Sequence, residues 1–188
     1  MAEPVTLTTA RLTLRAPGAA DVDAIYEACQ DPDIQYYTTV PSPYTRADAE
    51  AFVTLVDGWW EDGSEYVWAL HSAEAFAGMV GLHKISDGGS ELGFWATPEA
   101  RGNGYMTEAA RAVIDFAFGP MRLERVTWRA VVGNNGSARV AQKLGFQFEG
   151  VQRKGLPHHG IGGAHGRTDG WVAGLLNTDS RLPTTWAL

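Results

Sequence analysis

The sequence predicts an α+β domain built on a mixed, largely antiparallel sheet. Short segments in which apolar and polar residues alternate recur along the chain, and several are separated only by turn-length connections, which favours antiparallel neighbours. Two later helical patterns lie between strands, which allows a parallel pair in the same sheet. We expect about seven strands and about four helices in one domain, residues 1–188, with a core of about 9–176 and a fraying tail, 178–188.

The ends of the expected helices carry recognisable signals. Asp21 precedes apolar residues spaced i, i+3, i+4 and i+7, and the Asp-Pro-Asp at 31–33 stops this helix. Thr45 and Asp48 have capping-box spacing and begin a second helix, and Gly145 follows the last helix as a left-handed cap. The expected elements, in order, are strand 11–15, helices 22–29 and 45–60, strands 66–70, 76–85 and 91–96, helix 106–117, strand 125–132, helix 137–144, and strands 146–153 and 168–176.

Composition excludes several classes of protein. The 22 Asp and Glu residues exceed the 15 Lys and Arg residues and give a formal charge of −7, which disfavours general nucleic-acid binding. A hydrophobic content of 45% excludes wholesale disorder. Cys29 is the only cysteine, so no intramolecular disulfide forms. Residues 1–15 do not resemble a secretory signal and no apolar run is long enough to cross a membrane, so we expect a soluble cytoplasmic protein.

The densest chemical signal is the loop that opens the helix at 106–117. Gly102 and Gly104 lie in the segment Arg-Gly-Asn-Gly-Tyr-Met, and a glycine-containing loop before a helix presents free N–H groups to an anion. Arg101 adds a positive charge, so a pyrophosphate is the natural ligand. The loop lacks the Lys-Ser or Lys-Thr of a Walker A motif, and Thr107 replaces the third glycine of a Rossmann fingerprint. The alternative is that the glycines only make a tight turn.

Residues 92–109 closely resemble the acetyl-CoA signature of the GNAT superfamily of N-acetyltransferases, Arg/Gln-x-x-Gly-x-Gly/Ala. Arg101 and Gly104 match this signature, whereas Met106 stands where Gly or Ala is usual. Residues 134–146 resemble the Asn-x-x-Ser block of the family, which ends in Leu-Gly-Phe. The wording Gly-Tyr-x-Thr-Glu-Ala, together with 9–15 and 149–153, is similar to the RimJ/RimL branch, which acetylates ribosomal-protein N-termini.

The resemblance implies a GNAT fold and transfer of an acetyl group from acetyl-CoA to a primary amine by direct attack. It implies that Ser137 protonates the leaving thiolate and that Glu91 is the general base, with Asp169 as the alternative base or as an anchor for the amine. From the residues alone, Ser137 could also cap a helix and Glu91 could be an ordinary strand-end charge. The residues expected to bind acetyl-CoA are Trp95, Ala96, Arg101, Gly102, Asn103, Gly104, Tyr105, Met106, Thr107, Asn134 and Lys143.

The expected acceptor is a protein or peptide N-terminal α-amine, bound by Tyr36, Tyr37 and Asp169. The α-amine has an ordinary pKa of about 8 and a lysine amine about 10.4, so the α-amine is more readily neutral and nucleophilic. Two alternatives stay open: a small amine such as an antibiotic or polyamine, and a non-catalytic acyl-CoA-binding module. The resemblance also suggests a homodimer.

The segment 155–166 contains five glycines and three histidines. We expect it to form a mobile loop over the acceptor entrance. His158, His159 and His165 match no zinc-ligand spacing, so we expect no metal. Trp60, Trp68 and Trp128 are expected in the core.

Overall fold

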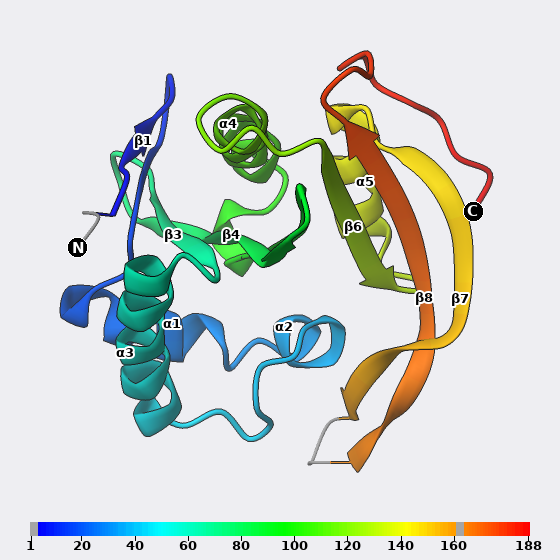
Figure 1. Cartoon of the computed structure of the whole chain (residues 1–188). Helices are drawn as coiled ribbons and strands as arrows, with labels where there is room; N and C mark the ends of the chain where they lie inside the picture. Colours follow the sequence, from blue (N-terminus) through cyan, green and yellow to red (C-terminus); the bar gives the residue numbers. More distant parts are fainter. Residues whose placement is uncertain (1–3, 161–163) are drawn as a thin grey trace.

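An eight-stranded sheet with helices on both faces forms the protein (Figure 1). The computed structural model describes residues 4–160 and 164–188, apart from the side chains of 158–165. The strands lie in the order β1-β2-β3-β4-β5-β6-β8-β7. The described elements are β1 (Leu7–Thr8), β2 (Thr13–Arg15), the 3-10 turn η1 (Ala19–Asp21), α1 (Val22–Ala28), α2 (Pro32–Tyr37), α3 (Arg46–Asp62), β3 (Tyr66–His71), β4 (Phe76–Ser86), β5 (Gly89–Ala96), the 3-10 turn η2 (Pro98–Ala100), α4 (Tyr105–Phe118), β6 (Arg125–Val131), α5 (Asn135–Leu144), β7 (Gln147–Gly160) and β8 (Ala164–Leu176).

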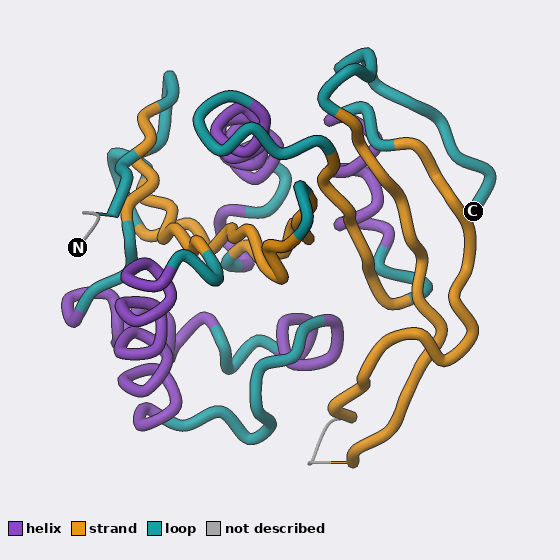
Figure 2. Tube along the Cα trace, viewed as in Figure 1, coloured by secondary structure: helices purple, strands orange, loops and turns teal. Residues whose placement is uncertain are grey.

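The sheet divides at the pair β5–β6. These strands run parallel and pair from Gly89 opposite Arg125 to Leu92 opposite Trp128. Beyond that point β5 continues against β4 and β6 continues against β8, so the two strands separate and leave a wedge between them. Figure 2 shows the result, with the strands β6, β8 and β7 standing as a group apart from β3 and β4.

The helices cover the two faces of the sheet unequally. Helices α1, α2 and α3 lie on one side, whereas α4 and α5 lie on the other (Figure 1). The main core contains Trp68 and Trp128, which are fully buried, and Trp60, which is 3% exposed, so the expectation for these three residues is confirmed. A smaller core joins α1 to α3.

The predicted helix ends agree with the structure. The Thr45 N–H donates to Asp48 Oδ2 (2.7 Å) and the Asp48 N–H donates to Thr45 Oγ1 (3.2 Å), which completes the capping box of α3. Gly145 ends α5 at φ +93°, in the left-handed region. These local signals therefore predicted the start of α3 and the end of α5, whereas α5 begins at Asn135 rather than at 137 and α3 ends at Asp62 rather than at 60.

Four short elements were missed, namely β1, α2 and the 3-10 turns η1 and η2. The Asp-Pro-Asp at 31–33 ends one helix as expected but also begins α2, because Asp31 Oδ1 accepts the Ile34 N–H at 3.0 Å and Pro32 occupies the first helical position. The same residues therefore act as stop and start signals. The two-residue strand β1 is too short to leave a periodic pattern.

The prediction of an irregular loop at 155–166 was wrong for the backbone that the structure describes. Strands β7 and β8 pair onward from Leu156 opposite Thr168 to Gly160 opposite Ala164, so this segment extends a hairpin. Backbone ladders do not depend on side-chain periodicity, which glycine and histidine obscured here. The side chains of His158, His159 and His165 lie outside the described residues.

The tail was expected to fray, and this was also wrong. The Thr184 N–H donates to Gln142 O (2.9 Å), and Thr184 Oγ1 donates to Phe146 O (2.7 Å). The ring of Trp186 lies 5.4 Å from that of Trp128, centroid to centroid. An aromatic side chain near the chain end supplies enough buried surface to hold the tail against α5 and the sheet.

Candidate active site

A cleft of about 560 Å³ occupies the wedge between β5 and β6 and continues to α2 and to the first turns of α4 and α5. It gathers most of the residues that the sequence selected. The predicted residues that line it are Tyr37, Trp95, Ala96, Arg101, Gly102, Gly104, Tyr105, Met106, Thr107, Asn134, Ser137 and Lys143. Asn103, Glu91, Tyr36 and Asp169 are not among the lining residues.

The loop before α4 has the geometry of an anion site. Gly102 and Gly104 have φ of +80° and +78°, a conformation that favours glycine. The first helical bond of α4 runs from the Glu108 N–H to Gly104 O (3.1 Å), so the N–H groups of 105–107 precede it. These groups and the positive end of the helix dipole point toward the cleft end of α4, where a phosphate would be stabilised.

Arg11 braces this loop from outside, and the sequence reading missed it. Its Nη1 donates to Asn103 O (2.9 Å), and its Nε donates to Glu108 Oε2 (2.7 Å). Glu108 also accepts from Thr9 Oγ1 (2.6 Å). In the sequence, residues 9–11 contributed only to the family resemblance. In the structure they lie between β1 and β2, and their contacts connect this segment to the phosphate loop and to α4.

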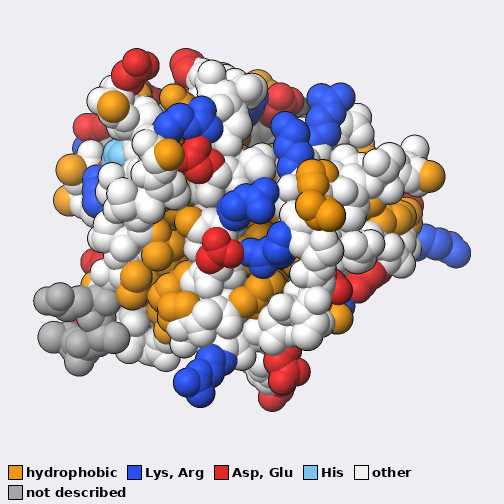
Figure 3. All heavy atoms as spheres, turned by 90° about the horizontal axis from the view of Figure 1, so that it is seen from above, with side chains coloured by type: hydrophobic (Ala, Val, Ile, Leu, Met, Phe, Trp, Pro, Cys, Tyr) orange, Lys and Arg blue, Asp and Glu red, His pale blue; other side chains and the backbone are white. Residues whose placement is uncertain are grey.

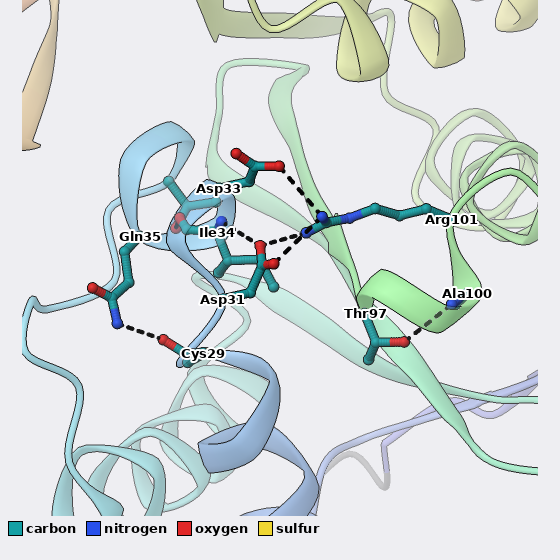
Figure 4. A network of polar contacts seen from close by, with 9 residues as sticks. Cys29, Asp31, Asp33, Ile34, Gln35, Thr97, Ala100 and Arg101 are labelled. Carbon is teal, nitrogen blue, oxygen red and sulfur yellow. Dashed lines mark hydrogen bonds and ion pairs between the residues drawn. The ribbon is translucent and has the colours of Figure 1, made fainter. Parts of the chain in front are cut away.

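Arg101 turns toward α2 rather than standing free in the loop (Figure 4). Its Nη2 bonds Asp31 Oδ1 at 2.6 Å, and its Nη1 lies 3.4 Å from Asp33 Oδ2. Since Asp31 also caps α2, Arg101 joins the phosphate loop to the helix that carries Tyr37. One side of the cleft is therefore held to the other by an ion pair.

Met106, the departure from the family signature, does not obstruct the loop. The residue is 7% exposed and belongs to the main core under α4. Its side chain is thus accommodated by packing, and its backbone N–H remains one of those that precede the first helical bond.

Ser137 has a defined hydrogen-bonding position. The N-cap of α5 is Asn134, whose Oδ1 accepts the Ser137 N–H (3.2 Å), so Ser137 does not itself cap the helix. The indole N–H of Trp128 donates to Ser137 Oγ at 2.9 Å. A hydroxyl that accepts from an indole keeps its own proton for another partner. Ser137 is therefore oriented as a donor in the wall of the cleft.

Glu91 is engaged in ion pairs at the narrow end of the wedge. Its Oε2 accepts from Arg129 Nη2 (2.5 Å) and from Lys84 Nζ (2.9 Å). Burial alone would raise the pKa of Glu91, but the hydrogen bonds from Arg129 and Lys84 hold it below its ordinary value. A carboxylate stabilised in this way accepts a proton less readily.

Of the three predicted acceptor residues, Tyr36 and Tyr37 are in contact on α2, whereas Asp169 lies on β8 and does not line the cleft. Tyr37 lines the cleft from α2, and its ring makes an edge contact with that of Tyr36, 4.8 Å away between centroids. Asp169 is exposed on β8, where its Oδ1 accepts the Lys154 N–H at 2.7 Å. Lys154 lies in the irregular part of the β7–β8 pairing, so Asp169 holds a bend in the hairpin.

A second hollow, of about 570 Å³, adjoins the outer side of α4 and shares Gly104, Thr107 and Lys143 with the cleft. Arg111 also lines it. Seen from above, Lys and Arg side chains gather near the middle of this face of the acidic protein (Figure 3). The hollow is also lined by Glu108 and Asp115, which are paired with Arg11 and Arg181. Arg111 and Lys143 are the lining cations that suit a ligand with several phosphates.

No group of three potential metal ligands occurs among the side chains that the structure describes. Within the same described part of the chain, none of the helices is both long and apolar enough to pass through a bilayer.

Comparison with known proteins gives this arrangement a family. The family model described as the acetyltransferase (GNAT) domain matches residues 11–147. The chain is 29% identical over 153 residues to the N-acetyltransferase YnaD of Bacillus subtilis (strain 168), covering 80% of this chain and 88% of YnaD. It is 33% identical over 124 residues to YjcK of the same organism, also named as an N-acetyltransferase, covering 63% and 66%.

Among solved structures, the coenzyme A complex of RimL, a ribosomal-protein alpha-N-acetyltransferase, has a TM-score of 0.82 and 17% identity, covering 92% of this chain and 98% of RimL. This likeness is one of fold, and it agrees with the RimJ/RimL resemblance of the sequence. The chain belongs to the GNAT acetyltransferases. It is an acetyl-CoA-dependent N-acetyltransferase.

Proposed function

We propose that the protein acetylates the N-terminal α-amine of a protein or peptide. The observation that carries this proposal is the single cleft that joins the phosphate loop to Ser137 and to Tyr37 on α2. Such a cleft lets an acyl donor and an amine meet from opposite ends. RimL, whose fold is similar, is named for this class of acceptor.

The residues of the cleft fit acetyl-CoA. The N–H groups of 102–107 would receive the pyrophosphate, with Lys143 beside the outer phosphates and Asn134 beside the pantetheine arm. Trp95 and Ala96 lie beyond the last β5–β6 pair, so the edge of β5 that faces the wedge is unpaired there. Its backbone groups are free to bond the amide groups of the arm, as a neighbouring strand would.

The transfer needs a neutral amine, a stabilised oxyanion and a protonated leaving group. The amine nitrogen forms a bond to the thioester carbon while the carbon–sulfur bond breaks. A backbone N–H at Trp95 or Ala96 would donate to the oxyanion, and Ser137 Oγ–H would donate to the departing thiolate. Tyr37 would contact the acceptor from α2 and Tyr36 would support it.

Two carboxylates are candidates for the general base. Glu91 remains the candidate from the family resemblance, although its ion pairs with Arg129 and Lys84 oppose proton uptake. Asp169 remains the second candidate, although it already accepts a backbone N–H.

A panel of acceptors tests the function. The purified protein is incubated with acetyl-CoA and with peptides that carry either a free α-amine or a blocked N-terminus and one lysine, and mass spectrometry locates the acetyl group. Polyamines and aminoglycosides form the second arm. Acetylation confined to free α-amines supports the proposal, and acetylation of small amines alone overturns it. Saturable acetyl-CoA binding without turnover on any amine would favour the non-catalytic module.

We also propose a homodimer, on the family resemblance alone, and a cytoplasmic location, which the sequence predicts. Light scattering coupled to size-exclusion chromatography measures the oligomeric state, and fractionation of cells that express the full chain measures the location. A monomer at micromolar concentration contradicts the first expectation.

A further inference from the structure

We propose that His83, oriented by Glu65, is the general base that takes the proton from the attacking amine. The proposal rests on the proposed acetyl transfer and adds a base to it. Neither His83 nor Glu65 was selected from the sequence, because the two residues belong to no motif and lie 18 positions apart.

The sheet brings the two side chains together by register. His83 on β4 is paired with Glu91 on β5, and Tyr66 pairs with Leu82, which sets Glu65 opposite His83 at the start of β3. His83 Nδ1 lies 2.6 Å from Glu65 Oε2. A carboxylate at this distance holds the Nδ1 proton, which leaves the lone pair on Nε2 available to accept another.

A floor of two glycines makes room for the imidazole. Gly81 on β4 and Gly93 on β5 are paired across the sheet. A Cβ at Gly81 would lie 2.8 Å from His83 Nε2, and a Cβ at Gly93 would lie 3.0 Å from it. Neither glycine is among those with positive φ, so the space for the ring, rather than the backbone conformation, requires a residue without a side chain.

Gly93 marks the point where the wedge begins. It is the first residue of β5 after the last β5–β6 pair, Leu92 opposite Trp128, and the next residue, Phe94, lines the cleft. Alternation along β4 and β5 puts His83 on the face of the sheet that carries Trp95. Leu82 and Leu92, which alternate with His83 and Glu91 and so lie on the other face, belong to the main core with α4, whereas Trp95 also contacts the smaller core of α1–α3. The face of His83 is therefore opposite to the one that packs on α4. An amine would approach from this side, because the donor occupies the other.

The surroundings distinguish His83 from Glu91. The charged groups near the imidazole are Glu65, Glu91, Lys84 and Arg129, and both cations bond Glu91 rather than Glu65. The side chains of His83 and Glu65 are 31% and 25% exposed, so water or an amine can reach them. Glu65 is thus a positioning residue for His83, while Glu91 is paired with the two neighbouring cations.

His83 Nε2 takes one proton from the ammonium form of the acceptor, directly or through a water, and the neutral amine attacks the thioester carbon. The nitrogen–carbon bond forms, the carbon–sulfur bond breaks, and the second nitrogen proton reaches the sulfur by way of Ser137. His83 then returns its proton to solvent, so one proton is released for each amide formed.

Steady-state kinetics of His83→Gln test the proposal with an acceptor that the wild-type protein acetylates. We expect kcat at pH 7 to fall about 100-fold while KM for acetyl-CoA changes less than about twofold. The defect should shrink as pH rises toward the pKa of the amine, because solvent then supplies neutral amine. It should also shrink with an acceptor whose amine has a lower pKa. A purely structural role would reduce the rate equally at every pH and with every acceptor.

Three further variants sharpen the test. Glu65→Gln should lower kcat less than His83→Gln and shift the pH profile, whereas Glu61→Gln, an exposed glutamate on α3, serves as the matched control. Gly93→Ala should displace the imidazole and reproduce the His83 defect with the circular dichroism of the wild type. A His83→Gln variant with wild-type kcat and pH profile overturns the proposal while the acetyl transfer stands. A wild-type protein that acetylates no amine overturns both.

Discussion

The indole N–H of Trp128 donates to Ser137 Oγ at 2.9 Å, from a residue that is 1% exposed. Trp128 is also the last β6 residue paired with β5, so the hydroxyl that lines the cleft is held from the point where the sheet divides. A side chain assigned only to the core therefore connects the wedge to its candidate acid.

Replacement of Ser137 should impair chemistry more than binding. We expect Ser137→Ala to lower kcat about 100-fold with little change in KM for acetyl-CoA, because the thiolate loses its proton donor. The exposed Ser64, which does not line the cleft, supplies the matched control as Ser64→Ala. Thiol release, followed with a chromogenic reagent, gives kcat and the KM for acetyl-CoA of each variant. Wild-type turnover by Ser137→Ala would remove Ser137 from the mechanism.

The ion pair between Arg101 and Asp31 makes a prediction about stability. Asp31→Ala removes both the cap of α2 and the partner of Arg101, so the free energy of unfolding should fall by about 1 kcal/mol. Asp33→Asn should change it by less than about 0.5 kcal/mol, since Asp33 is exposed and lies 3.4 Å from the guanidinium. Urea denaturation of both variants measures the difference. Equal losses would show that the cap and the ion pair contribute little.

Asp21 should make stability depend on pH in the acid range. Burial alone would raise the pKa of Asp21, but hydrogen bonds from Arg15 and from the Gly18 N–H hold it below its ordinary 3.8. Because the folded pKa is depressed, the stabilisation is complete above that value and is lost as pH falls through the folded pKa.

Asp21→Ala should therefore destabilise the protein by about 1–2 kcal/mol at pH 7, because the buried Asp21 loses its hydrogen bonds while Arg15, whose side chain is 38% exposed, can be solvated. The difference in the free energy of unfolding between the wild type and Asp21→Ala should become smaller below the ordinary pKa of aspartate. Thermal unfolding of both proteins from pH 7 to pH 2.5 measures this difference. A difference that does not change with pH would contradict the depressed pKa of Asp21.

Gly78 controls the position of the cleft edge. It has φ +143°, and a Cβ there would meet Trp95 O at 2.2 Å. We expect Gly78→Ala to cost about 3 kcal/mol and to weaken acetyl-CoA binding by displacing β5. Gly58→Ala is the control, because a Cβ at Gly58 meets nothing within 4 Å and should add about 0.5–1 kcal/mol of stability in α3. Calorimetric titration with acetyl-CoA measures the change in affinity, and urea denaturation measures the change in stability.

Local signals predicted most of the fold and the glycine loop before α4. The capping box at Thr45, the cap at Gly145 and the loop at Gly102 and Gly104 each depend on a few neighbouring residues, and the structure contains them as expected. The extension of the last hairpin and the docked tail depend on distant partners, which no local pattern reports. The contacts of Arg11 with Asn103 and of His83 with Glu65 could not be predicted either, because the partners are 92 and 18 residues apart in the sequence.

The roles of two predicted carboxylates, Asp169 and Glu91, could not be predicted from the sequence for a related reason. Asp169 is occupied by the bend at Lys154, and Glu91 is occupied by Arg129 on the neighbouring strand. A carboxylate in a sequence shows that charge is available, whereas only the register of the sheet shows which cation or N–H has already taken it.

The short parallel seam from Gly89–Leu92 to Arg125–Trp128 has a mechanical consequence. Among the described residues, all ladder hydrogen bonds between strands β1–β5 and strands β6–β8 are in this pair, so it is the connection between the two halves of the sheet. A ligand bound in the wedge contacts both halves and adds interactions between them beyond the β5–β6 pairs. Occupancy should therefore slow amide exchange in β6 and β5 together, and the melting temperature should rise with ligand concentration as mass action requires.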